Sequence, residues 1–302
     1  MVFFDVILPV LLIAAVGFIL GRRLDVDPRP LARVTLYGLS PSLVMWSLSG
    51  ASLDAAEVLD IAVFALLLTG GMTAAALIVA RSFGLHGPRR MALLLSSLFM
   101  NAGNYGMPVV LFALGPEALQ RAVVFVIVQN LLTYSVGIAI AVQGRGAERT
   151  DLGRAVRTMF GQPAFYAGLA GFGLRAWGDA VPDLLLRPLE LLAGAAVPVL
   201  LLLLGLQMAR VRPQVAAVRD VALASVLRLG LSPLLALVLA GLLQMPDLTA
   251  RVLILEAAMP SAVVVTLLAV EFDALPEVVS STTLTTTLAS TATVTTLLAF
   301  LA

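Results

Sequence analysis

Residues 101–108 read "NAGNYGMP", with two asparagines, two glycines and a proline, inside an otherwise uncharged apolar run over residues 91–116. Pro108 cannot donate a hydrogen bond to the carbonyl at position 104, and its ring clashes with that carbonyl. Gly103 and Gly106 allow non-helical dihedral angles. We therefore predict a membrane helix that is interrupted in its middle.

An interrupted helix frees backbone groups that lipid cannot satisfy, so these groups must face protein or a water-filled cavity. Asn101 and Asn104 can bond the freed groups or a ligand, although polar residues also commonly cross-link packed membrane helices. A half-helix that begins near Pro108 would point its N-terminal amides, with about half a positive charge, toward the interruption. Such a site suits an anion.

The composition places the whole chain in a membrane. Of its 302 residues, 60% are hydrophobic and 12% are charged, and the mean hydropathy is +1.04. Soluble domains are about 45–50% apolar and about 25% charged. The absence of cysteine and the single histidine, His86, exclude disulfides and cysteine- or histidine-based metal sites. The net charge of +1 does not indicate a nucleic-acid partner. We expect no cofactor and no bound metal beyond a coupling ion.

About ten segments are long and apolar enough to cross the hydrocarbon core, which needs roughly 20 residues per helix. They are residues 3–21, 31–49, 58–80, 91–115, 121–143, 161–177, 186–208, 217–243, 250–270 and 277–301. Their length and the lack of period-2 alternation favour helices over barrel strands. The first is interpreted as a span and not as a signal peptide, because it lacks a basic start and a cleavage site.

The arginines predict the orientation. Connections one, three, five and seven carry fourteen arginines, and the even-numbered connections carry four. Arginine accumulates on the cytoplasmic side of membrane proteins. We therefore predict a multi-pass protein of the plasma membrane (the inner membrane of a bacterium), with both termini outside.

The ten segments divide into two halves of five. The predicted units are a first repeat (1–144), a basic cytoplasmic loop (145–160) and a second repeat (161–302). Because each half has an odd number of spans, the second enters the membrane from the opposite side. "NYGMP" at 104–108 matches "EAAMP" at 256–260, which places Met107 over Met259 and Pro108 over Pro260. Paired helix breakers in inverted halves indicate the binding site of a transporter.

With these motifs the chain resembles the auxin efflux carrier family, whose prokaryotic members include malate and malonate permease-like proteins. The resemblance covers the whole chain. It rests on "NAGNYGMP", "VPVLLLLLGLQMA" (197–209), "LRLGLSPLL" (227–235) and "AMPSAVVVTLLAVEFDA" (258–274).

The resemblance implies an all-α protein of ten helices in two inverted five-helix repeats, with broken helices four and nine crossing. It implies a scaffold of spans 1, 2, 6 and 7, a transport unit of spans 3–5 and 8–10 that moves like an elevator, and compatibility with a homodimer. The fold is shared with bile acid:sodium symporters, in which span nine supplies a sodium-binding glutamate that Glu256 resembles.

Two charged residues lie deep inside predicted spans. An ionised acid there costs about 2.5–3.5 kcal/mol on insertion scales, so Glu256 is either a site for a coupling ion, Na⁺ or H⁺, or protonated and inert. Arg228 can pair with Glu256, contact an anionic substrate or extend to the cytoplasmic interface.

Other interior polar residues remain. Of Gln129 and Asn130 in span five, Asn130 is favoured because it lies close behind the interruption. Gln207 in span seven is expected at the interface. Span ten has twelve Ser or Thr in residues 280–296 and is expected to pack behind the crossing, where its hydroxyls can bond carbonyls one turn back.

We expect a secondary transporter of a small organic anion, a carboxylate, that works by alternating access. The alternative is a sodium-coupled symporter of a sterol-like or other amphipathic anion. An enzyme is not expected, because Glu256 is the one acid well inside a span and the chain has no phosphate-binding G-x-x-x-x-G-K-[ST] loop. The candidate substrate residues are Asn101, Asn104, Gly106, Pro108, Asn130, Arg228, Met259, Pro260 and Ser261, with Glu256 for the coupling ion.

Overall fold

The chain is all-helical in a computed structural model that describes residues 3–142, 161–178, 181–211 and 217–301, where no β-strand forms. Six helices are continuous, apolar and long enough to cross a membrane. They are Phe3–Arg23, Ala55–Ser82, Pro116–Val142, Asp183–Arg210, Val218–Leu242 and Pro276–Leu301. This confirms the prediction of a polytopic helical membrane protein. The predicted loop 145–160 lies outside the described residues.

Helices occupy every predicted apolar segment, and several contain a π-helical turn (η). Before the midpoint the elements are η1 (Phe3–Ile7), α1 (Leu8–Arg23), α2 (Pro28–Val34), η2 (Thr35–Leu39), α3 (Ser40–Ser49), α4 (Ala55–Ser82), α5 (Gly87–Leu98), η3 (Ala102–Gly106), α6 (Met107–Leu114), α7 (Pro116–Leu132), η4 (Thr133–Gly137) and α8 (Ile138–Val142). After it they are α10 (Pro163–Trp177), α11 (Asp183–Arg210), α12 (Val218–Val226), η7 (Leu227–Leu231), α13 (Ser232–Leu242), α14 (Asp247–Ala257), α15 (Val263–Phe272) and α16 (Pro276–Leu301).

Local sequence explains where several helices begin. The Asp54 side chain accepts a hydrogen bond from the backbone N–H of Glu57 at 2.7 Å and so caps the first turn of α4. Proline opens α7 and α16, at Pro116 and Pro276, where its missing N–H has no partner to lose. Gly115, between α6 and α7, has φ of 84°, which a residue with a side chain rarely adopts.

Two apolar segments are interrupted. Residues 99–101 separate α5 from η3, and residues 258–262 separate α14 from α15. The first interruption lies several residues before the expected half-helix start, because residues 102–106 already form a π-helical turn. Pro108 is the second residue of α6, where a proline is tolerated.

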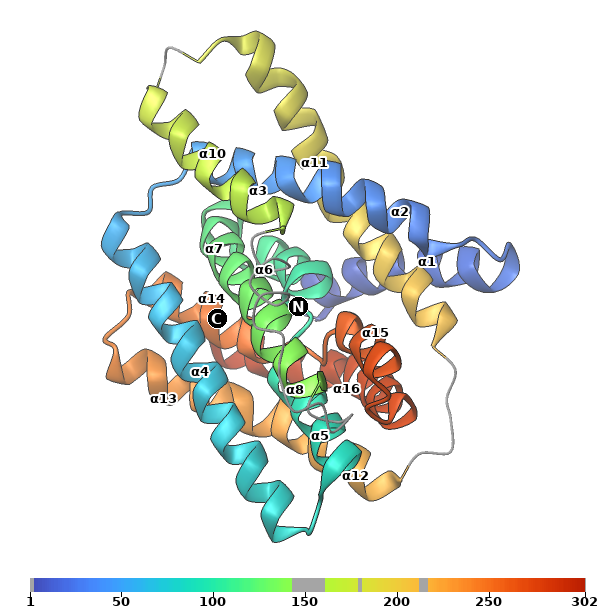
Figure 1. Cartoon of the computed structure of the whole chain (residues 1–302). Helices are drawn as coiled ribbons and strands as arrows, with labels where there is room; N and C mark the ends of the chain where they lie inside the picture. Colours follow the sequence, from blue (N-terminus) through green and yellow to red (C-terminus); the bar gives the residue numbers. More distant parts are fainter. Residues whose placement is uncertain (1–2, 143–160, 179–180, 212–216, 302) are drawn as a thin grey trace.

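Glycines bring one group of helices into close backbone contact. A Cβ atom at Gly17 of α1 would overlap the carbonyl of Leu202 in α11, and Gly205 of α11 faces α1 in the same way. A Cβ at Gly171 of α10 would lie 2.8 Å from the carbonyl oxygen of Met45 in α3. Small residues allow this close packing in membranes. Helices α1, α3, α10 and α11 therefore form one packed group, which we call the glycine-packed group (Figure 1).

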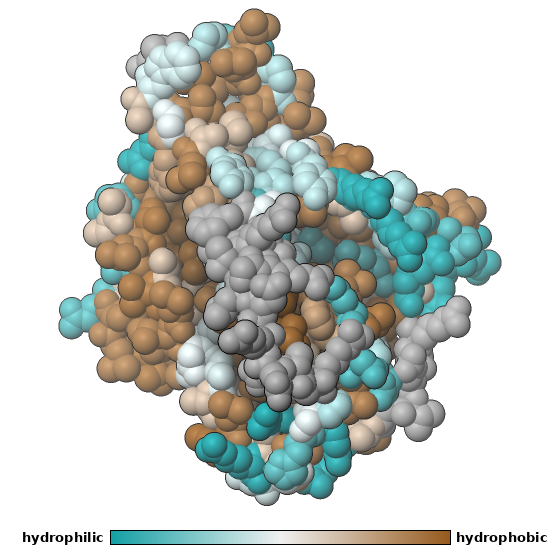
Figure 2. Space-filling view, viewed as in Figure 1, coloured by the Kyte–Doolittle hydropathy of each residue, from teal (hydrophilic) through white to brown (hydrophobic). Residues whose placement is uncertain are grey.

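Helices α4 to α8 and α12 to α16 pack around the two interruptions. Helix α4 contacts α5, α7 and α13, and α12 contacts α5 and α16 (Figure 1). Their outer surface is apolar: Leu59 and Ile78 of α4 and Leu242 of α13 are more than 60% exposed. Figure 2 shows hydrophobic residues gathered over α4 and α13 on the left of the view. A surface of this kind is suited to contact with lipid.

Two pairs of helix starts lie farther apart along the chain than the motif match predicted. Helix α5 begins at Gly87 and α14 at Asp247, and Pro116 opens α7 as Pro276 opens α16. These two pairs of helix starts are equally far apart along the chain, and farther apart than Pro108 and Pro260. The match of 104–108 with 256–260 is therefore wrong as a structural equivalence. Pro108 opens α6, whereas Pro260 lies inside an interruption.

Candidate functional site at the crossing of two interrupted helices

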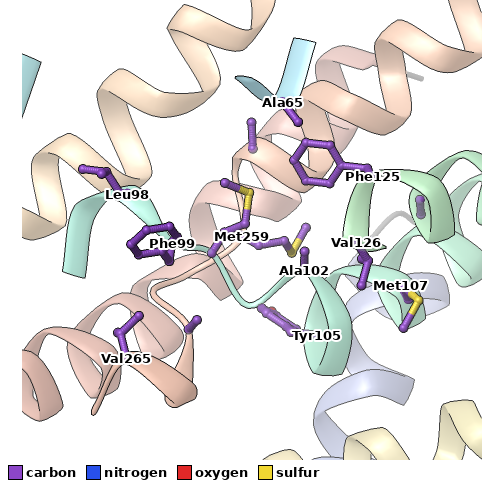
Figure 3. Close-up of a cluster of buried hydrophobic side chains, with 14 of the residues drawn as sticks. Ala65, Leu98, Phe99, Ala102, Tyr105, Met107, Phe125, Val126, Met259 and Val265 are labelled. Carbon is purple, nitrogen blue, oxygen red and sulfur yellow. The ribbon is translucent and has the colours of Figure 1, made fainter. Parts of the chain in front are cut away.

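The two interruptions cross and hydrogen-bond to each other. The backbone N–H of Asn101 donates to the carbonyl of Pro260 at 2.8 Å, and the N–H of Ala262 donates to the carbonyl of Phe99 at 3.0 Å. Met100 and Ser261 form an isolated antiparallel bridge between these bonds. Figure 3 shows the two extended segments crossing, with Phe99 and Met259 beside them. Each interruption thus satisfies backbone groups that the other leaves free.

Arg228 holds the C-terminal ends of both helices that enter the crossing. Its Nη1 donates to the carbonyls of Ser97, at 3.0 Å, and Leu98, at 3.1 Å, in the last turn of α5. Its Nη2 donates to the carbonyl of Ala257, the last residue of α14, and to the hydroxyl of Ser232. The last carbonyls of a helix lack partners and carry partial negative charge, so a cation stabilises them.

This contact differs from two of the three expectations for Arg228, and the third, contact with an anionic substrate, stays a prediction. The side chain is fully buried, so it does not extend to the interface, and it forms no ion pair with Glu256. Only its Nε lacks a hydrogen-bond partner. The sequence contained no signal for this role, because the bonded carbonyls belong to two other helices, one far before Arg228 in the chain and one well after it.

The helices that leave the crossing have free N-terminal ends. Neither η3, preceded by Asn101, nor α15, preceded by Ala262, has a side chain that caps its first turn. The N–H of Ser261 donates to the hydroxyl of Thr286 in α16, at 3.1 Å. Because η3 continues into α6, both departing helices present partial positive charge toward the crossing.

Several buried polar groups around the crossing have no hydrogen-bond partner in the described part of the chain. They include the Nδ2 atom of Asn101, the hydroxyl of Ser261 and both ends of the Gln129 side chain. Buried polar groups normally have partners, so each orphan indicates a water, ion or ligand position. Gln129 is buried and unpaired, whereas the favoured Asn130 is partly exposed.

Glu256 lies in the last turn of α14 and is fully buried. Both of its carboxyl oxygens lack hydrogen-bond partners, and no cation of the described residues lies within ion-pair distance. A Cβ atom added at Gly106 would lie 2.7 Å from the carboxyl carbon of Glu256. A side chain at position 106 would therefore displace this carboxyl group from its present position.

Asn104 and Gln207 meet across two elements. The Nδ2 of Asn104, in η3, donates to the Oε1 of Gln207, in α11, at 3.3 Å. Both side chains are partly exposed. Gln207, expected at the membrane interface, thus has a partner in η3 that the sequence did not predict. Two polar residues in opposite halves of the chain give no local signal of such a contact.

The Ser/Thr-rich helix α16 packs behind the crossing, as expected. Besides the bond from Ser261 to Thr286, the hydroxyl of Ser290 lies 3.5 Å from that of Tyr105 in η3. Most other hydroxyls bond carbonyls one turn back, such as Thr282 to Val278. The sequence did not single out Thr286.

Two polar contacts at the ends of the helices were also missed by the sequence analysis. Arg89, the third residue of α5, forms a bidentate ion pair with the buried Asp220, the third residue of α12. Its Nε and Nη2 donate to the two carboxylate oxygens at 2.8 and 2.9 Å. Thr249, the third residue of α14, bonds Glu57, the third residue of α4, and Arg121 of α7 joins them at 2.8 Å. These contacts occupy equivalent positions in the two halves of the chain.

A surface groove of about 490 Å³ lies elsewhere, between α13, α14 and the end of α16. Its lining includes the exposed Leu237 and Phe300, with Asp247 and Arg251 at the start of α14. None of the crossing residues lines it. The groove is therefore separate from the candidate site.

The sequence profile of a family described as membrane transport protein matches residues 2–298. An uncharacterized transporter of Methanothermobacter thermautotrophicus is 33% identical over 282 residues, which are 92% of this chain and 91% of that protein. An uncharacterized transporter of Methanocaldococcus jannaschii is 26% identical over 295 residues, 94% of each chain. The similarity extends over the crossing and over both groups of helices.

Proposed function

Because the chain belongs to the membrane transport protein family, which includes the auxin efflux carriers, we propose that it is a secondary transporter of a small organic anion. The proposed cargo carries a carboxylate and binds at the crossing. One observation carries this proposal: the negative helix ends at the crossing are neutralised by Arg228, whereas the positive helix ends are uncapped.

The electrostatic argument follows from the helix dipole. Each helix end carries about half an elementary charge. The guanidinium of Arg228 bonds carbonyls at both C-terminal ends, so it offsets about one negative charge. Because the two C-terminal ends are neutralised, the N-terminal ends of η3 and α15 give the crossing a net positive electrostatic potential. A carboxylate is favoured there over a cation or a neutral cargo.

Unpaired donors beside the positive helix ends fit the same cargo. The Nδ2 of Asn101 and the hydroxyl of Ser261 can both donate to a carboxylate oxygen. The candidate positions Met259 and Pro260 supply backbone on the other side of the crossing. Asn130 of α7 is retained as a candidate; like Asn104 of η3, it is partly exposed.

We assign coupling to Glu256. Its carboxyl group is buried without any partner, which is unfavourable for a charged acid unless an ion or a proton occupies the position. Coupling to H⁺ or to Na⁺ would supply that partner. The alternative cargo is an amphipathic anion that is carried with sodium. Its coupling ion would bind at the same Glu256 position, and its uptake would depend on the sodium gradient.

The proposed architecture has ten membrane-spanning helices in two inverted five-helix repeats. It is supported by the equal spacing of equivalent helix starts, by the mutual hydrogen bonds of the two interruptions and by the equivalent contacts of Asp220 and Glu57. In this scheme the glycine-packed group is the scaffold, and the other helices carry the crossing past it as an elevator. A homodimer is compatible with this arrangement.

Uptake into proteoliposomes tests the function. We expect a labelled carboxylate to accumulate when a proton or sodium gradient is imposed, and an equal gradient of a neutral analogue to show no carrier-mediated flux. Separate proton, sodium and potassium gradients distinguish the coupling ion and the alternative cargo. Equal leak in liposomes with and without protein, for all carboxylates tried, would reject an anion transporter.

The proposed orientation, with both termini outside, has a clean test because the chain has no cysteine. His86 and Gln244 are exposed in connections predicted to lie inside and outside, respectively. In intact cells, an impermeant maleimide should label Gln244→Cys and leave His86→Cys unlabelled. The reverse pattern would invert the proposed orientation.

A further inference from the structure

A single hydrogen bond links the glycine-packed group to the turn that follows the crossing. The Oε1 of Gln207 in α11 accepts from the Nδ2 of Asn104 in η3, at 3.3 Å. Among the described residues it is the only side-chain hydrogen bond between α11 and η3. Helix α11 is itself held against α1 through Gly17 and Gly205. Gln207 therefore belongs to α11, a helix of the glycine-packed group, and its side chain extends from that group to the turn that follows the crossing.

The position of this bond distinguishes it from the buried contacts at the crossing. Asn101, Glu256 and Ser261 are buried, whereas Asn104 and Gln207 are partly exposed. The pair is thus accessible from outside the packed core, unlike the buried groups at the crossing. A distance of 3.3 Å is also at the long end for an N–H···O bond, so the bond is weak and readily exchanged.

We propose that Gln207 is a place-holder for the cargo carboxylate. In the empty transporter its amide oxygen accepts the hydrogen bond of Asn104, and an arriving carboxylate oxygen displaces it. An amide oxygen and a carboxylate oxygen both accept from an amide N–H, but the bond to the charged group is about twice as strong. The exchange therefore proceeds toward the bound cargo and releases this one contact between α11 and η3. This inference rests on the proposed function.

The proposal assigns Gln207 as a positioning residue that acts through Asn104, and it predicts opposite effects for two substitutions. Gln207→Met is similar in size and removes the competing acceptor, so the cargo binds more tightly. The loss of one neutral hydrogen bond corresponds to a decrease in Kd of about two- to tenfold. Gln207→Glu ties a carboxylate permanently to Asn104 and repels the cargo, so Kd rises by about tenfold or more.

The experiment measures binding and uptake with the full-length protein. Succinate and benzoate, a dicarboxylate and a monocarboxylate, are titrated in a thermal-shift assay against the wild type and both Gln207 variants, since a ligand that prefers the folded state raises the melting point. Gln244→Glu, at an exposed turn away from the crossing, adds the same charge and serves as the control. The Asn104→Ala background completes a double-mutant cycle.

The expected result is tighter binding for Gln207→Met, weaker binding for Gln207→Glu, no change for the control and no effect of Gln207→Met when Asn104 is alanine. A structural role for Gln207 would shift both variants in the same direction, and that result overturns the inference. If Gln207→Glu fails to fold, the Met variant decides: an unchanged or raised Kd contradicts the place-holder. If the wild type binds neither probe and transports neither, the proposed function fails together with the inference.

Discussion

Replacing Arg228 with methionine is predicted to destabilise the protein more than it weakens anion binding. The substitution keeps the apolar stem and removes the guanidinium that bonds Ser97, Leu98, Ala257 and Ser232. The carbonyl of Ala257 keeps a bond from the hydroxyl of Ser232 at 2.8 Å. Two buried carbonyls, those of Ser97 and Leu98, lose the donors that Arg228 provides.

The magnitude follows from these two carbonyls. Each buried group left without a partner costs about 1–3 kcal/mol, which gives about 2–6 kcal/mol for the pair. The partners left behind are neutral carbonyls, so no uncompensated charge remains in the core. We therefore expect a loss of about 2–6 kcal/mol in the free energy of unfolding.

Thermal unfolding of the purified protein in detergent checks this value. At roughly 1.6 °C per kcal/mol for a chain of 302 residues, the Arg228→Met variant should melt about 3–10 °C below the wild type. Arg228→Lys keeps the charge and three donors and should recover part of the loss. Arg187→Met is the control, because the exposed Arg187–Asp183 pair contributes only about 0–1 kcal/mol.

An unchanged melting temperature would refute this reasoning, particularly if the same variant no longer bound the carboxylate. That combination would mean that Arg228 contacts the cargo and that its carbonyl contacts are dispensable. Loss of stability together with retained affinity in the surviving folded fraction would confirm the role at the helix ends.

Five further substitutions, two of them controls, probe other contacts. Glu256→Gln should leave the melting temperature within about 2 °C of the wild type and abolish gradient-driven uptake, and unchanged uptake would remove Glu256 from coupling. Gly106→Ala should lower transport and stability by displacing the Glu256 carboxyl, whereas Gly103→Ala, whose added Cβ meets only a methyl group at 3.9 Å, should fold normally; equal effects would contradict the contact. In helix α11, Gly205→Ala should cost about 1–3 kcal/mol through overlap with α1. Gly194→Ala, with no atom within 4 Å, should instead stabilise by about 0.5–1 kcal/mol, and denaturant unfolding that ranks the two variants in the opposite order would refute the packing argument.

Part of the candidate site could be predicted from the sequence because the residues that interrupt a helix act on the backbone next to them. Proline and glycine weaken the interior of a helix through local backbone chemistry, so the motif at 101–108 predicted an interrupted helix. The interruption itself falls at residues 99–101, because the chain resumes as a π-helical turn before Pro108. The match between "NYGMP" and "EAAMP" failed for a related reason: a shared Met–Pro pair marks a helix breaker without specifying on which side of it the helix breaks.

The sequence by itself determined the membrane environment, the apolar segments and the presence of interrupted helices, since these depend on composition and on the backbone chemistry of a few residues. Only the tertiary structure decided what the isolated polar residues contact. Arg228 finds carbonyls of two helices that enter the crossing, Gln207 finds Asn104, and Glu256 finds the space beside Gly106. Such partners are distant in the chain, and the packing of the helices, which no local pattern encodes, brings them within bonding distance.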